Sequence, residues 1–108
     1  MDDVLKSLYA VIEQRKTSPV EGSYTCYLFE KGIDKILKKV AEECGETLIA
    51  AKNGAAEQTV SEIADLLYHT LVLMSAQNIP LEALTEELSR RAEKIGNLKV
   101  MRETDRAT

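Results

Sequence analysis

The 108-residue sequence lacks tryptophan and contains few residues that break or cross-link a chain. Five glycines and two prolines leave room for long helices, and an aromatic content of 5% is low for a sandwich of short strands. The two cysteines, Cys26 and Cys44, are too few for a disulfide scaffold and have no partner at metal-ligand spacing. No signal peptide and no apolar run long enough for a membrane span is evident. We therefore expect a soluble, cytoplasmic protein with no membrane partner.

Charge and overall composition narrow the class further. Lys and Arg total 14 against 18 Asp and Glu, which gives a formal net charge of −4. This acidic balance, without a dense Lys/Arg cluster, argues against nucleic acid as a partner. The hydrophobic content of 44% and the charged content of 30% are typical of a globular domain. We expect one domain over residues 1–108, with a frayed polar tail over about 103–108.

Helical periodicity dominates the chain. It predicts four helices, over residues 2 to about 16, about 32 to 52, 55–59 to about 77, and 81 to about 102. Turn residues separate them, including Asn53-Gly54 and the Pro80 that follows Asn78-Ile79. The segment 23–31 has no clean period and is interpreted as an ordered loop or a short irregular element. The expected fold is an all-α bundle of about four helices.

Apolar residues of the second and third predicted helices indicate an assembly. The third helix is apolar on nearly all sides, so a homo-oligomer would be an effective way to cover it. The second helix carries one apolar stripe, formed by Ile33, Ile36, Leu37, Val40, Cys44, Leu48 and Ala51.

Carboxylates lie beside this apolar surface. On the third helix, Glu62, Asp65 and His69 share a face, because steps of three and four residues return to one side. On the second helix, a fan of glutamates occupies one flank. If the helices pack face to face, Glu43, Glu46, Glu62 and Asp65 approach a common point, where only a bound cation would relieve their repulsion. Oxygen ligands favour Mg²⁺, with Mn²⁺ able to substitute. The glutamates of the flank are Glu42, Glu43 and Glu46.

Other interpretations remain open from the residues alone. Lys38 and Lys39 lie four residues before Glu42 and Glu43, so the acidic flank could be a solvated face with surface ion pairs. A di-iron carboxylate bundle would need Glu-x-x-His on two helices, and the chain has one histidine. A non-catalytic, partner-binding bundle is a third possibility. His69 itself is explained more readily as a hydrogen-bonded, semi-buried histidine than as a metal ligand.

The acidic motifs resemble those of a known superfamily. Residues 42–46 (EECGE) and 62–65 (EIAD) form the pattern EExxE…ExxD of the all-α, MazG-type nucleoside-triphosphate pyrophosphohydrolases. Within it, the segments LYAVIEQRK, SYTCYLFEKGIDKILKKVAEECGE and EIADLLYHTLVLM closely resemble the phosphoribosyl-ATP pyrophosphohydrolase family. The resemblance covers residues 5 to about 91.

This resemblance implies a specific enzyme. It implies hydrolysis of 1-(5-phosphoribosyl)-ATP to 1-(5-phosphoribosyl)-AMP and pyrophosphate, the second step of histidine biosynthesis, with Mg²⁺ and in a homo-oligomer that is at least a dimer. The alternative is a related house-cleaning NTP or dNTP pyrophosphatase. Glu43, Glu46, Glu62 and Asp65 are then the expected metal ligands, and Glu42 a further ligand or the catalytic base.

Several further residues could contact this nucleotide substrate. Lys35 and Lys39 could reach a metal-bound phosphate or only neutralise nearby glutamates, and the hydroxyl groups of residues 23–25 could bind a ligand or cap a helix. The candidate substrate-binding residues, chosen from position and charge, are Arg15, Ser23, Tyr24, Thr25, Lys35, Lys39 and His69.

Overall fold

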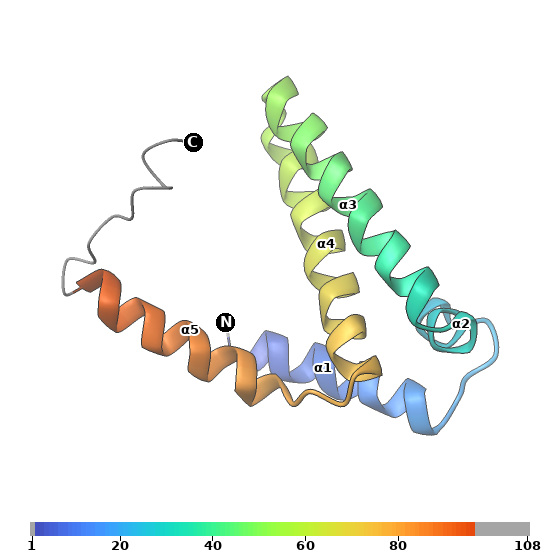
Figure 1. The fold of residues 1–108 in the computed structure, drawn as a ribbon. Coiled ribbons are helices and arrows are strands. Elements are labelled where there is room, and N and C mark those ends of the chain that lie inside the picture. Colours follow the sequence, from blue (N-terminus) through green and yellow to red (C-terminus); the bar gives the residue numbers. More distant parts are fainter. Residues whose placement is uncertain (1, 97–108) are drawn as a thin grey trace.

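The computed structural model describes residues 2–96, which form five α-helices and no strand (Figure 1). The prediction of an all-α fold is confirmed. Within these residues, no helix combines the length and the apolar character needed to cross a membrane. The helices are α1 (Asp2–Thr17), α2 (Tyr24–Lys31), α3 (Ile33–Asn53), α4 (Ala56–Ala76) and α5 (Leu81–Gly96).

The two longest helices, α3 and α4, lie side by side as an antiparallel hairpin (Figure 1). The predicted turn at Asn53-Gly54 joins them. Gly54 adopts a left-handed conformation with φ of 72°, and its N–H donates to the Ala51 carbonyl at 3.1 Å. A side chain is disfavoured in this conformation, so glycine ends α3 and reverses the chain.

The segment interpreted as a loop is a helix, so that prediction was wrong. Ser23 caps α2, because its Oγ accepts a hydrogen bond from the Cys26 N–H at 3.1 Å. Gly32, with φ of 93°, ends the helix, and its N–H donates to the Leu28 carbonyl. Leu28 is the one fully buried side chain of α2. Two turns with a single core position are too short for a recognisable period.

The hydrophobic core lies where α1 and α2 meet the C-terminal half of α4. The buried positions of α3 are Ile36, Glu43 and Ala50, which are seven residues apart and therefore face α4 along one line. The apolar stripe expected on α3 mostly lies outside this line, and Leu48 is 69% exposed. The core cluster consists of Tyr9, Ile12, Leu28, Ile36, Leu71, Val72, Met74 and Leu81.

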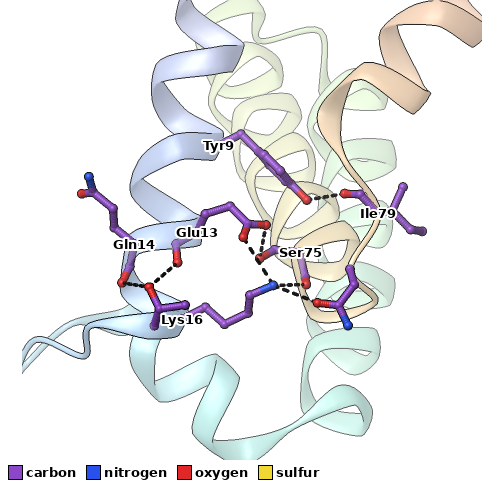
Figure 2. Close-up of polar contacts among 8 residues, drawn as sticks. Tyr9, Glu13, Gln14, Lys16, Ser75 and Ile79 are labelled. Carbon is purple, nitrogen blue, oxygen red and sulfur yellow. Dashed lines mark hydrogen bonds and ion pairs between the residues drawn. The ribbon is translucent and has the colours of Figure 1, made fainter.

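A polar network around the buried Ser75 joins α1 to the end of α4 (Figure 2). The fully buried Ser75 Oγ donates to Glu13 Oε1 at 2.9 Å. Lys16 Nζ donates to the Ser75 carbonyl at 2.7 Å and to Asn78 Oδ1 at 3.2 Å. These bonds satisfy a carbonyl at the C-terminus of α4 and fix the angle between the two helices.

Helix α5 extends away from the α3–α4 hairpin (Figure 1). Only its first residue, Leu81, is buried. The predicted continuation of this helix to about residue 102 and the frayed tail at 103–108 lie outside the described residues.

Candidate metal centre

Three carboxylates from α3 and α4 meet at one point of the hairpin. One oxygen from each of Glu43, Glu62 and Asp65 lies within 4.8 Å of the others. Glu43 occupies the central position of the buried line on α3, while Glu62 and Asp65 are three residues apart on one face of α4. The packing of two ordinary helices therefore brings together carboxylates that are 19 to 22 residues apart in sequence.

The cluster is poorly compensated by protein groups. Glu43 is only 5% exposed, and the Oε2 atoms of Glu43 and Glu62 are buried without a hydrogen-bond partner in the described part of the chain. Burial raises the pKa of Glu43, and the negative charges of Glu46 and Asp65 raise it further. The pKa of Glu62 is raised first by its hydrogen bond with Glu46 and then by burial. A divalent cation would satisfy both unpaired oxygens and the excess negative charge.

The neighbouring glutamates occupy the rim of this cluster. Glu46 is exposed, and its negative charge raises the pKa of both Glu43 and Glu62. Glu42 is also exposed and pairs with Lys39, whose Nζ lies 3.6 Å from Glu42 Oε2. The same Nζ lies 3.8 Å from Glu43 Oε1. Glu42 therefore forms a surface ion pair with Lys39. Glu43 is buried, and its Oε2 has no hydrogen-bond partner in the described residues although its Oε1 lies near Lys39.

His69 is a buried, hydrogen-bonded residue directly beside the cluster. Its Nδ1 donates to the Asp65 carbonyl at 2.7 Å, because a carbonyl oxygen can only accept. In the neutral ring, Nε2 then accepts a hydrogen bond from the Tyr24 hydroxyl at 3.0 Å. Both ring nitrogens are thereby used, so the structure favours the semi-buried, hydrogen-bonded histidine over a metal ligand.

Tyr27 and Tyr68 were missed in the sequence, and their rings lie beside the candidate residue Tyr24. The Tyr24 ring stacks on Tyr27 at a centroid distance of 6.1 Å, and Tyr68 packs edge-on against His69 at 4.9 Å. Thr25 Oγ1 shares a hydrogen bond with the Tyr68 hydroxyl. The Ser23 cap and the Gly32 terminator of α2 were the signals for this helix, but the segment was interpreted as a loop.

The other candidate substrate contacts lie at varied places. Ser23 is the α2 cap, and the Arg15 carbonyl accepts a weak hydrogen bond from Cys26 Sγ at 3.4 Å. Lys35 lies over the Tyr27 ring, with Nζ 5.9 Å from the ring centroid. Lys35 and Lys39 thus follow one flank of α3 that leads towards the carboxylates.

Comparisons with known proteins identify the family of this chain. The family model described as phosphoribosyl-ATP pyrophosphohydrolase matches residues 5–92. A protein of Clostridium acetobutylicum named phosphoribosyl-ATP pyrophosphatase is 57% identical over 98 residues, which cover 91% of this chain and 89% of the relative. A protein of the same name from Clostridium botulinum is 54% identical, and the match covers 95% of this chain and 94% of the relative. A third, from Bacillus cytotoxicus, is 52% identical, and the match covers 97% of this chain and 98% of the relative. The chain therefore belongs to the phosphoribosyl-ATP pyrophosphohydrolase family.

Proposed function

We propose that this enzyme hydrolyses 1-(5-phosphoribosyl)-ATP to 1-(5-phosphoribosyl)-AMP and pyrophosphate in the cytoplasm, as the second step of histidine biosynthesis. Membership of the family supports the reaction, and the relatives' shared name supports the substrate. The observation that carries the proposal is the convergence of Glu43, Glu62 and Asp65 between α3 and α4. The comparisons do not favour the alternative of a general NTP pyrophosphatase.

The carboxylates fit Mg²⁺, with Mn²⁺ as a possible substitute. Glu43, Glu62 and Asp65 would supply oxygen ligands at one point, and the exposed Glu46 is the proposed fourth ligand. The buried, unpartnered Oε2 atoms of Glu43 and Glu62 support this assignment, because such atoms are costly unless something binds them. When bound, Mg²⁺ would stabilise the negative charge that develops on the pyrophosphate leaving group.

Glu42 and Lys39 would position the attacking water and the triphosphate. Water attacks the α-phosphorus, the bond between this phosphorus and the oxygen bridging to the β-phosphate breaks, and pyrophosphate leaves with the bond electrons. Glu42, on the exposed rim, would orient this water and accept its proton. Lys39 pairs with Glu42 and Glu43, so it would hold both in place and offer a positive charge to the triphosphate.

Isotope labelling tests the position of attack. Turnover in ¹⁸O-water is expected to place one ¹⁸O atom in the α-phosphate of phosphoribosyl-AMP, as measured by mass spectrometry of both products. Label in pyrophosphate instead would show attack at the β-phosphorus. The absence of both products would contradict the proposed function.

The exposed apolar surface of the hairpin supports a homo-oligomer, at least a dimer. Six large apolar residues of α3 and α4 are exposed in the single chain, and exposed apolar surface of this kind often marks an interface. Sedimentation of the unmodified protein is expected to give a dimer or larger species, and Leu48→Asp with Ile49→Asp to shift it towards monomer. Ser89→Asp on α5 serves as the matched control, and a monomeric unmodified protein would contradict this assembly. The six residues are Ile33, Leu37, Leu48, Ile49, Val60 and Ile63.

A further inference from the structure

A row of polar and aromatic side chains leads away from the carboxylate cluster. It begins at Glu43, whose Oε1 lies 3.8 Å from Lys39 Nζ. Lys39 in turn lies close enough to Tyr24 for its charge to act on the tyrosine hydroxyl. The Tyr24 ring then stacks on the Tyr27 ring, and the two residues are 45% and 39% exposed. This row gives a nucleotide an accessible aromatic surface next to the candidate metal centre.

Two ammonium groups end the row. Lys31 Nζ lies 5.8 Å and Lys35 Nζ 5.9 Å from the centroid of the Tyr27 ring. Neither lysine forms an ion pair with a carboxylate in the described part of the chain, in contrast to Lys39. Two like charges held around one ring attract an anion more strongly than a single surface lysine does. The pair is therefore suited to a phosphate.

The order of these groups along the protein matches the order of charges along the proposed substrate. Phosphoribosyl-ATP carries a triphosphate, then a purine, and then a second ribose with its own 5′-phosphate on the opposite side of the base. Along the row, carboxylates for a metal and the triphosphate come first, the tyrosines follow, and the two lysines come last. Lys35 and Glu43 are eight residues apart on α3, a rise of about 12 Å along the helix.

We propose that Lys31 and Lys35 bind the 5′-phosphate of the phosphoribosyl group, with the purine against Tyr24 and Tyr27, and thereby distinguish phosphoribosyl-ATP from ATP. This inference rests on the proposed function, because it assigns one end of the same substrate. Since ATP lacks the second phosphate, it would use the carboxylates and Lys39 but leave the lysine pair unoccupied. The pair therefore determines specificity and takes no part in the chemical step.

The double variant Lys31→Gln/Lys35→Gln tests this assignment. The KM for phosphoribosyl-ATP is expected to rise about 10- to 100-fold, the range for lost charged hydrogen bonds to phosphate, while kcat changes less than about threefold. The inhibition constant of ATP as a competitor is expected to stay within about threefold, because ATP does not reach the pair. Lys31→Arg/Lys35→Arg should restore most of the affinity, since guanidinium groups also bind phosphate.

A matched control carries the same change of charge elsewhere. Lys38→Gln/Lys52→Gln removes two exposed lysines of α3 outside the row and should leave both constants unchanged. An unchanged KM in the Lys31/Lys35 variant, or an equal loss of affinity for ATP and phosphoribosyl-ATP, would overturn this inference while leaving the proposed function intact. If the unmodified protein does not turn over phosphoribosyl-ATP, the proposed function fails and this inference fails with it.

Discussion

Replacing Glu43 by glutamine separates two effects of its carboxylate, charge repulsion in the metal-free protein and metal binding during catalysis. The change keeps the shape of the side chain but removes its charge from a site where one oxygen of Glu43, Glu62 and Asp65 lies within 4.8 Å of the others. A pair of unit charges at 4.8 Å repels by about 1 kcal/mol at the dielectric constant of water and by about 3.5 kcal/mol at an effective value of 20. Attraction to Lys39, at 3.8 Å, offsets part of this repulsion.

The net sign follows from the raised pKa of Glu43, which shows that its surroundings disfavour the ionised form. In the presence of EDTA at neutral pH, Glu43→Gln is therefore expected to raise the free energy of unfolding by about 1 to 2 kcal/mol. This corresponds to a Tm increase of about 5 to 10 °C for a domain of this size. Activity with Mg²⁺ should fall about 100-fold or more, because a metal ligand is lost.

Thermal unfolding, with and without Mg²⁺ and at one protein concentration, measures the first effect, and the rate of pyrophosphate release measures the second. Mg²⁺ should raise the Tm of the unmodified protein and have a much smaller effect on the variant. Glu86→Gln, at an exposed position of α5, is the matched control and should change neither quantity. A Glu43→Gln variant that is less stable without metal, or that keeps full activity, would refute the reasoning.

Three further predictions follow from the same structure. In EDTA, the free energy of unfolding should fall as pH rises above 4.5, because the raised pKa values of Glu43 and Glu62 make the folded state bind more protons than the unfolded state. Urea unfolding at several pH values should show a weaker fall in Glu43→Gln. Equal pH dependence in the variant and the unmodified protein would contradict the assigned cause. Ser75→Ala should lower the free energy of unfolding by about 1 to 2 kcal/mol, because it removes the hydrogen bond to Glu13 between α1 and α4 (Figure 2). The kcat of the folded variant should be unchanged. A loss below about 0.3 kcal/mol would show that this hydrogen bond contributes little to stability. Leu71→Ala, at a fully buried core position, should cost about 2 to 5 kcal/mol by urea unfolding, and a loss no larger than that of an exposed position would place Leu71 outside the core.

The sequence predicted the long helices well because their boundaries are chemically marked. Asn53-Gly54 ends α3 with a left-handed glycine, and Pro80 follows the end of α4. The α2 helix was missed because a two-turn element with one fully buried residue, Leu28, carries too little periodicity. Its Ser23 cap and Gly32 terminator were the signals that could have identified it.

Glu43, Glu62 and Asp65 converge as expected, whereas Glu46 is exposed and lies outside this group. Their role as metal ligands stays a prediction, and the burial of Glu43 was not foreseen. Steps of three residues on α4 and the packing of α3 against it bring Glu43 to Glu62 and Asp65. The sequence placed Glu43 on a flank beside the apolar stripe, whereas it lies at the centre of the buried line and much of the stripe is exposed. Periodicity identifies an apolar face but does not say whether the same chain or another copy covers it. The tyrosines beside the site could not be placed, because their position depends on α2.

The most direct test of the central claim is the rate of pyrophosphate release from phosphoribosyl-ATP by the purified protein, with Mg²⁺ and with EDTA, beside ATP and dNTP controls. We expect turnover that requires Mg²⁺, is strong for phosphoribosyl-ATP, and is lost in Glu43→Gln and Glu62→Gln. Turnover of the controls without turnover of phosphoribosyl-ATP, or full activity in both variants, would contradict the central claim.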